Sequence, residues 1–309
     1  MSNDPSTPPA KLAVVLSCHG TVEKVEDIPA FVRNIRRGRP PPPEVIEEVT
    51  SRFEEIGGSP MMRITHAQAE ALEARLGVPV RATARLWEPY AGPVLEQLCE
   101  EGIERILSLP LAPQSVHVYN AVVEKEAAAR GLTVIAAPSW GEAPELVAAF
   151  VEAIEETRAR FDDVERERLG VVLSAHSLPT RIIAAGDPYE RDFRAMASAV
   201  STELVVSGVP VDRIRVAFQS QGMGGGDWLG PDLEATFASL AESGITSLLV
   251  APIGFLAEHV ETLYDIDIEA AKMAKHLGVG RLERMPAMDT RPAFIDALEA
   301  VARRLLPKT

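Results

Sequence analysis

Short apolar runs bounded by turn residues alternate with longer stretches of helical periodicity along most of the chain. The apolar runs predict buried strands at Leu12–Leu16, Ile103–Leu109, Thr133–Ala136, Gly170–Leu173, Arg213–Ala217 and Ser247–Ala251. Helical spacing of apolar residues predicts a helix over Thr65–Leu76, directly after a glycine- and proline-containing turn. Alternation of strands with helices is typical of parallel sheets covered on both faces, so we assign the chain to the α/β class.

Two of these strand regions are repeated within the chain. The sequence VVLSCHG at Val14–Gly20 returns as VVLSAHS at Val171–Ser177, 157 residues later. In the same order, LPLAPQSVH at Leu109–His117 matches APIGFLAEH at Ala251–His259. Apolar strands can resemble each other by chance, but two pairs in order favour a duplicated half.

The repeat predicts the domain organisation. We expect a disordered, proline-rich tail at residues 1–11, one half at residues 12–160 and a second half at residues 165–309, joined by an acidic linker. Ligands of parallel sheets bind at the carboxyl ends of the strands, where His19 and His176 both fall. The two halves are therefore expected to face a shared cleft.

Charge and cysteine content narrow the function classes. The chain has 309 residues, and 45 acidic against 31 basic residues give a net charge of −14, which disfavours nucleic acid and anionic membranes as partners. No apolar run approaches the roughly 20 residues of a transmembrane helix, and the start lacks signal-peptide features, so we expect a cytoplasmic protein. Cys18 and Cys99 are too few for an iron–sulfur cluster held by this chain alone.

Candidate chemistry lies at two places in the second half. His176 follows a predicted strand directly, where the simplest interpretation is a histidine with local hydrogen bonds. After the strand Ser247–Ala251, Glu261, Asp265 and Glu269 are spaced i, i+4 and i+8, so that at ~100° per residue they share one face of a helix. A solvated helix face is the usual explanation for such a charge run, and Lys272 at its end agrees with it.

A functional role for these three carboxylates is favoured by their position and by the electrostatic repulsion among them. The row begins close to the carboxyl end of a buried strand, and like charges one turn apart repel by roughly 0.2–0.5 kcal/mol per pair. His176 and Glu261 offer an imidazole and a carboxylate, ligands that suit Fe²⁺ or another divalent first-row ion. The same groups can accept protons near neutral pH.

Several segments spread along the chain resemble the ferrochelatase family. The matching segments are SAHSLP at Ser174–Pro179, PIGFLAEHVETLYDID at Pro252–Asp267, EDIPAFVRNIRRGR at Glu26–Arg39, IGGSP at Ile56–Pro60, GDPY at Gly186–Tyr189, FQS at Phe218–Ser220 and DWLGPD at Asp227–Asp232. The resemblance implies an enzyme that inserts ferrous iron into a porphyrin. It also implies two similar Rossmann-like, chelatase-type domains that clasp the macrocycle, with Fe²⁺ as substrate and no required cofactor.

The resemblance also implies roles for individual residues. His176 and Glu261 match the active-site pair of the family, and Asp265 and Glu269 match its acidic line toward the surface. The porphyrin-contacting positions correspond to Arg36, Arg52, Ser59 and Tyr119. His19 stands where similar members usually carry a tyrosine that faces the metal from the other side, so the resemblance implies the reaction but does not define the axial chemistry.

The sequence favours one porphyrin as substrate and leaves two other functions as alternative hypotheses. The arginines at positions 33, 36, 37 and 39 offer guanidinium groups to carboxylates, which favours coproporphyrin III over protoporphyrin IX. The expected partners are the porphyrin, Fe²⁺ and neighbouring enzymes of haem synthesis. One alternative is a sirohydrochlorin-type cobalt or nickel chelatase, suggested by the His-Gly step after the first strand. The other is a haem or porphyrin carrier without catalysis.

Overall fold

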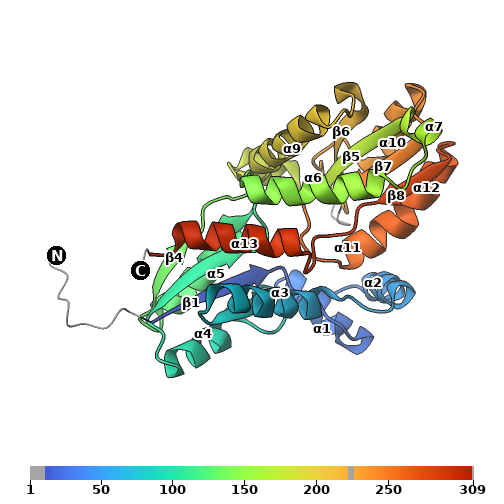
Figure 1. Cartoon of the computed structure of the whole chain (residues 1–309). Coiled ribbons are helices and arrows are strands. Elements are labelled where there is room, and N and C mark those ends of the chain that lie inside the picture. The colour runs from blue at the N-terminus through green and yellow to red at the C-terminus, as the bar shows by residue number, and fades with distance from the viewer. Residues whose placement is uncertain (1–10, 222–225, 308–309) are drawn as a thin grey trace.

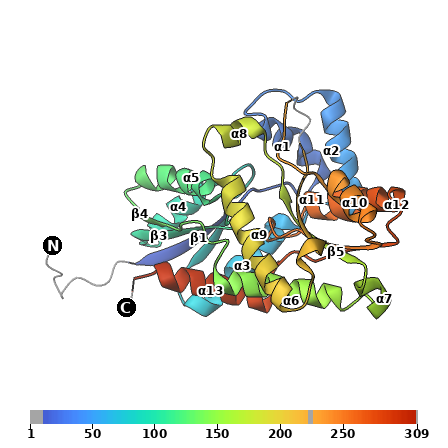
Figure 2. The same cartoon turned by 90° about the horizontal axis from the view of Figure 1, so that it is seen from above.

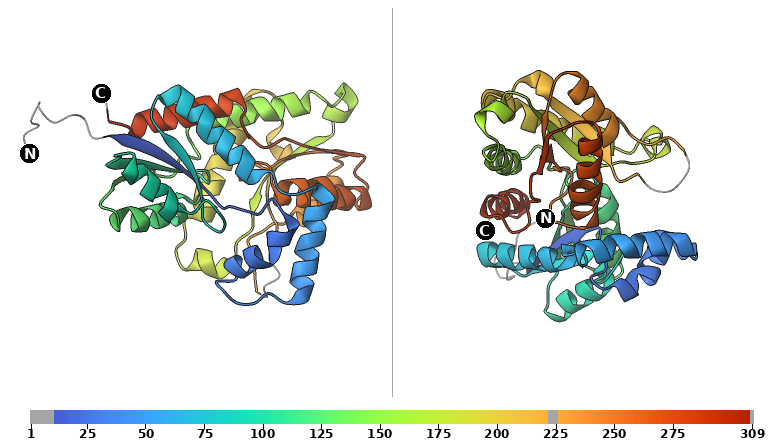
Figure 3. Two further views of the ribbon diagram at one scale, coloured as in Figure 1. Left: turned by 90° about the horizontal axis from the view of Figure 1, so that it is seen from below. Right: turned by 90° about the vertical axis from the view of Figure 1, so that its right-hand side faces the viewer.

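The computed structural model describes residues 11–221 and 226–307. The expected tail at residues 1–11 therefore falls outside the described residues, except for Lys11. Figure 3 shows both ends of the described chain on the same side of the molecule.

Two parallel sheets of four strands form the centre of the fold. The first contains β1 (Leu12–Cys18), β2 (Val80–Ala84), β3 (Arg105–Pro110) and β4 (Thr133–Ala136), and the second contains β5 (Leu169–His176), β6 (Ile214–Gln219), β7 (Ser247–Ala251) and β8 (Arg281–Arg284). The strand orders are β2-β1-β3-β4 and β6-β5-β7-β8. The same order in both sheets confirms the duplicated α/β architecture predicted from the sequence repeat.

Helices cover both faces of each sheet (Figure 1). Those between β1 and β4 are α1 (Ile28–Ile35), α2 (Pro43–Ile56), α3 (Met61–Leu76), α4 (Ala91–Glu100) and α5 (Val116–Ala128). After β4 come α6 (Pro144–Arg158), α7 (Asp163–Arg166), α8 (Thr180–Ala184), α9 (Tyr189–Val206), α10 (Leu233–Glu242), α11 (Val260–Leu263), a π-helix (Asp265–Ala270), α12 (Ala271–His276) and α13 (Pro292–Leu305). None of the helices within residues 11–221 and 226–307 has the length and apolar composition needed to cross a membrane.

The last helix of each half packs against the other half. Helix α6 packs on α9 and β7 of the second half, whereas α13 packs on α3 and β3 of the first half as well as on α6. Both helices lie between the two lobes in Figure 1. The domain boundary near residue 160 stays a prediction. Residues before and after this position share one hydrophobic core.

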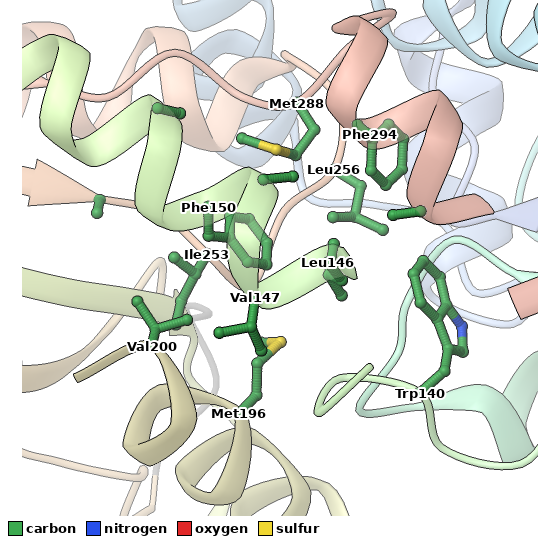
Figure 4. Packing of buried hydrophobic residues seen from close by; sticks show 14 of the residues in the cluster. Trp140, Leu146, Val147, Phe150, Met196, Val200, Ile253, Leu256, Met288 and Phe294 are labelled. Carbon is green, nitrogen blue, oxygen red and sulfur yellow. The ribbon is translucent and has the colours of Figure 1, made fainter. Parts of the chain in front are cut away.

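One hydrophobic core runs through this junction. It includes Val14 and Leu107 of the first sheet, Leu173 of the second sheet, Phe150 of α6 and Phe294 of α13, all fully buried. Figure 4 shows Val147 of α6 beside Met196 of α9, and Leu256 near Phe294 of α13. The junction therefore holds the two sheets in one relative orientation, with the cleft at their strand ends.

Strand prediction succeeded for the apolar runs and missed two strands. Residues 133–136 and 247–251 are strands with the predicted ends, and the other four runs overlap a strand. The strands β2 and β8 were not predicted, because VRATA and RLER each contain a single large apolar residue, Val80 and Leu282. Both strands lie outside the central strand pair of their sheets, where water and surface groups can accommodate the charged side chains of these runs.

A close backbone contact fixes the loop after β7. A methyl group built on Gly254 would lie 2.5 Å from Cβ and 2.8 Å from Cα of Ala175 in β5. The amide nitrogen of Gly254 donates to the carbonyl of Ser174 at 3.0 Å. Only glycine allows this approach, so the loop that leads to Glu261 is held directly against the strand that ends at His176.

We expect Gly254→Ala to lower the free energy of unfolding by about 1–3 kcal/mol, the usual cost of forcing a methyl group into a packed site. Urea unfolding followed by circular dichroism measures this change. Gly280→Ala is the matched control, because the nearest atom to its added methyl group would lie 3.5 Å away. Equal stability of the two variants would contradict the proposed constraint.

Candidate active site

A cavity of about 350 Å³ lies at the carboxyl ends of β1 and β5. Side chains from both halves line it. Those of the first half include Cys18, His19, Gln68, Arg85, Gln114 and Tyr119, and those of the second include His176, Asp187, Tyr189, His259 and Glu261. The cleft expected from the duplicated strands is therefore present, and it contains His19, Tyr119, His176 and Glu261 of the predicted site residues.

His176 and Glu261 form a direct pair in the cavity wall. Nδ1 of His176, the last residue of β5, lies 2.8 Å from Oε2 of Glu261 in α11. The two side chains are partly exposed, at 35% and 27% respectively. Ligand or proton can therefore reach both groups from the cavity.

Neighbouring polar groups fix the orientation of this pair. The amide of Gln219 donates to the carbonyl of Glu261 at 2.8 Å, and its oxygen accepts from the Ser174 hydroxyl at 2.7 Å. The Tyr189 hydroxyl donates to the carbonyl of His176 at 2.7 Å. Both catalytic candidates are thus held by groups on β5, β6 and α9, which belong to the same sheet and its covering helix.

The electrostatics of the pair favour a charged state. Burial alone would lower the pKa of His176, but the Glu261 carboxylate and its hydrogen bond outweigh burial and raise that pKa. Burial alone would raise the pKa of Glu261, but the facing imidazole outweighs it and lowers that pKa. The pair therefore shares a proton as imidazolium and carboxylate, and it can pass that proton on when a cation arrives.

Two further imidazoles line the cavity as neutral bases. His259 is 7% exposed, its Nδ1 donates to the carbonyl of Ala257 at 3.1 Å, and its Nε2 lies 3.9 Å from Oε2 of Glu261. Burial lowers the pKa of His259. His19 is exposed to the cavity, yet the surrounding protein lowers its pKa to about 4. A neutral imidazole keeps a lone pair, so both rings can accept a proton or bind a metal ion.

The acidic row does not continue as a regular α-helix. After α11 the backbone forms a π-helix over Asp265–Ala270, in which the amide of Glu269 donates to the carbonyl of Tyr264, five residues back. The prediction of carboxylates at regular α-helical spacing was therefore wrong in geometry. Asp265 and Glu269 nevertheless stay neighbours, because both lie within 4 Å of the Arg52 guanidinium. The described residues contain no group of three His, Cys, Asp or Glu side chains placed to hold a metal ion together.

The remaining predicted residues lie outside the cavity lining. Arg52 pairs with Glu48 and Asp265, and Ser59 is 3% exposed with a hydroxyl that has no hydrogen-bond partner among the described residues. Arg36 ends helix α1 on the surface. Their assignment as porphyrin contacts stays a prediction.

Sequence reasoning overlooked several lining residues. Arg85 lies in the cavity, and within the described chain no carboxylate pairs with its guanidinium. Asp187 accepts from Nε2 of His117 at 3.2 Å and so links the two halves at the cavity edge. The sequence repeat aligns His117 with His259. This alignment was the pattern in the sequence that could have indicated both histidines as site residues. Arg85 had no such signal, because it follows the strand β2 that was not predicted.

Two solved structures of SirB proteins are similar in fold to this chain. The chain has a TM-score of 0.60 to SirB from Bacillus subtilis with Fe³⁺, at 17% identity, covering 96% of this chain and 95% of that one. The sirohydrochlorin chelatase SirB from Bacillus subtilis subspecies spizizenii in complex with cobalt has a TM-score of 0.58 at 15% identity, covering 96% of this chain and 95% of that one. At these identities the likeness defines a chelatase-type fold.

Sequence comparison defines the family. The ferrochelatase family model matches residues 11–306. A ferrochelatase of Acidobacterium capsulatum is 38% identical, covering 95% of this chain and 94% of its own. A coproporphyrin III ferrochelatase of Bacillus subtilis is 34% identical, covering 96% and 98%. The chain belongs to the ferrochelatase family, which confirms the resemblance and the prediction of a metal chelatase.

Asp265 gives a test of the site's electrostatics. Burial raises its pKa to about 7 against an ordinary value of 3.8, with nearby Glu261 adding to the rise and Ser220 and Arg52 opposing it. As pH rises from 5 to 8, the unfolded carboxyl has already lost its proton while the folded one must still lose it, so this residue reduces stability. We expect Asp265→Asn to be more favourable at pH 8 than at pH 5, by about 2–3 kcal/mol in the free energy of unfolding.

Urea unfolding of wild type and variant at both pH values measures this difference. The contact with Arg52 strengthens when Asp265 is charged at pH 8, and it is already part of the raised pKa because it opposes the rise. Asp212→Asn, at an exposed position, is the control. The same pH dependence in wild type and in Asp265→Asn would contradict a raised pKa.

Proposed function

We propose that this chain inserts Fe²⁺ into a porphyrin, with coproporphyrin III preferred over protoporphyrin IX. The observation that carries the proposal is the His176–Glu261 pair, 2.8 Å apart in the wall of a cavity lined by both halves. Metalation removes two protons from the pyrrole nitrogens, so the site needs acceptors beside the macrocycle. The pair and the neutral His259 supply such acceptors.

The proposed mechanism starts with a distorted macrocycle. A planar porphyrin resists metalation because its N–H groups point inward, and an enzyme gains rate by binding the bent form more tightly. His176 then takes a pyrrole proton once its own proton has left along the row of acids, and the Glu261 carboxylate stabilises the imidazolium that forms. Asp265 and Glu269, farther along the chain, carry protons outward or iron inward. His19, from the other sheet, faces the metal from the opposite side.

Two features support an anionic porphyrin with many carboxylates. Arg85 brings a guanidinium without a carboxylate partner, among the described residues, into the cavity. The arginines at 33, 36, 37 and 39 are exposed and likewise lack ion-pair partners in the described chain, although the protein carries a net charge of −14. Coproporphyrin III has four propionates and protoporphyrin IX has two, so the former uses more of these groups.

The remaining parts of the proposal concern location and cofactors. We place the protein in the cytoplasm, where a water-soluble porphyrin and other enzymes of haem synthesis are available to it. Fe²⁺ is a substrate, and the reaction requires no bound cofactor. Two cysteines cannot supply the four thiolates of an iron–sulfur cluster.

The alternatives make different demands on the site. A porphyrin carrier has no need of a proton-sharing pair beside a row of acids, so loss of His176 would leave its function intact. A sirohydrochlorin chelatase would prefer cobalt or nickel and a more reduced macrocycle. Anaerobic mixing with Fe²⁺, Co²⁺ or Ni²⁺ and each tetrapyrrole, followed by absorbance, separates the three.

We expect His176→Ala to reduce metalation at least about hundredfold while porphyrin still binds, because a positioned acid–base group contributes 10²–10⁴-fold. Glu261→Gln should be nearly as damaging, whereas Asp265→Asn and Glu269→Gln should slow the reaction less. Anaerobic absorbance measures turnover, and fluorescence quenching measures porphyrin binding. Near-normal turnover of His176→Ala would disprove the assignment, and equal losses at all three acids would indicate a single metal site.

Coproporphyrin III should have the higher kcat/KM of the two porphyrins, and Arg85→Met should reduce that preference by roughly tenfold. Arg36→Ala should reduce it as well, because a contact with a propionate is lost. Arg303→Met is the control, because Arg303 is exposed and pairs with Glu299 on its own helix. Equal kcat/KM values for both porphyrins in the wild type would contradict the proposed preference.

A further inference from the structure

A single arginine on β8 joins both ends of the segment that carries Glu261. Nη1 of Arg284 donates to Oε1 of Glu258, which precedes α11, at 2.7 Å. Nε and Nη2 of the same side chain donate to the two carboxylate oxygens of Asp267, in the π-helix, at 2.7 and 2.9 Å. The side chains of Arg284 and Glu258 are only 10% and 12% exposed. One nearly buried guanidinium therefore holds this segment against the edge strand of the second sheet.

Glu258 connects the arginine to the start of α11. Its Oε1 also accepts from the amide of Ala287 at 2.9 Å, and its Oε2 accepts from the Thr262 hydroxyl. Thr262 is fully buried, and its Oγ1 accepts from the amide of His259 at 3.0 Å. A helix of four residues has few hydrogen bonds of its own, so these contacts define the turn that carries Glu261.

Asp267 holds the same segment by a contact that the acidic row does not use. Asp265 pairs with Arg52 of α2, whereas Asp267 pairs with Arg284 of β8. Helix α2 packs against α11, α12 packs on β8, and Figure 2 shows α2 beside the region of α11 and α12. The segment from α11 to α12 is therefore held by α2 of the first half and by β8 of the second.

The contacts of Glu258 link Arg284 to the geometry of the catalytic pair. Without Arg284, a nearly buried carboxylate loses its cation, which is unfavourable and drives the side chain toward water. The Thr262 hydroxyl is bonded to that carboxylate, so the turn of α11 moves with it. The 2.8 Å distance between Oε2 of Glu261 and Nδ1 of His176 depends on this turn, and small displacements of reacting groups reduce the rate strongly.

We propose that Arg284 is a positioning residue that acts through Glu258 and holds Glu261 at hydrogen-bonding distance from His176. This inference rests on the proposed function. Arg284 is not among the residues that line the cavity, so it supports the rate of metalation without contact to the porphyrin. A residue that contacts the porphyrin would change the KM for porphyrin instead.

The first test is Arg284→Met, which removes the guanidinium and keeps an unbranched side chain. We expect kcat at saturating Fe²⁺ and porphyrin to fall by about tenfold to hundredfold, while the KM for porphyrin stays the same. Arg281→Met is the matched control, because Arg281 lies on the same strand and also joins two carboxylates, Glu165 and Glu283. An unchanged kcat in Arg284→Met would overturn the role of Arg284.

A double variant separates positioning from a general loss of folded protein. In the Glu261→Gln background, Arg284→Met should have little further effect on kcat, because the carboxylate that Arg284 positions is already absent. A smaller folded fraction would lower kcat by the same factor in both backgrounds, and that result would contradict the proposal.

Asp267→Asn keeps the proposal testable if Arg284→Met does not fold. Asp267 is 39% exposed, and its amide replacement can accept only one of the two hydrogen bonds from Arg284. We expect kcat to fall by about twofold to fivefold, the range for one partly exposed ion pair, with the KM for porphyrin unchanged. A change in KM with unchanged kcat would contradict a positioning role.

Hydrogen exchange tests the same contacts without turnover. In the porphyrin-free protein, peptides that cover residues 258–264 should exchange about tenfold faster in Arg284→Met than in wild type, and equally fast in Arg281→Met and wild type. Mass spectrometry after deuterium labelling measures these rates, and equal rates in Arg284→Met and wild type would overturn the proposal. Absence of iron insertion by the wild type would instead contradict the proposed function, and the exchange rates would still decide whether Arg284 holds the turn of α11.

Discussion

The packing of α6 and α13 between the two sheets is the constraint on which the site depends. Each of these helices follows the strands of one half and packs against the other half, so neither sheet has a complete core alone. The resulting orientation brings the carboxyl ends of β1 and β5 to the same cavity. Gln68 strengthens the junction, because its fully buried amide donates to the carbonyls of Leu256 and Asp289 at 2.9 and 2.8 Å.

The site combines this rigid junction with an uneven distribution of charge. In the second half, a histidine at a strand end has a carboxylate partner, whereas in the first half His19 occupies the corresponding position without one among the described residues. Desolvation by the protein around the cavity lowers the pKa of His19 to about 4, while Glu261 raises the pKa of His176 despite burial. Duplication therefore supplied two similar imidazoles, and a single carboxylate made them chemically different.

Much of this arrangement was predictable from the sequence, and the failures have physical causes. Apolar strands at the centre of each sheet gave a clear signal, and the repeat located both strand ends that carry histidine. The strand β2 lacked that signal, so Arg85 at its end was missed. The π-helix was not predictable from spacing alone, because the row at Glu261, Asp265 and Glu269 fits a regular α-helix equally well. Partners that come from distant segments, such as Gln219 for Glu261 and Arg52 for Asp265, carry no local pattern.

The π-helix gives the acidic row a property that a regular helix would lack. In a regular helix the three carboxylates would follow one stripe at similar depth, and their mutual repulsion would favour solvent exposure. Here Glu261 faces the cavity, Asp265 is buried beside Ser220, and Glu269 is the most exposed of the three. A wider turn in the backbone thus spreads one row of acids from the cavity wall to the surface. This gradation suits groups that transfer a proton or cation in steps, because each step changes the environment of the charge.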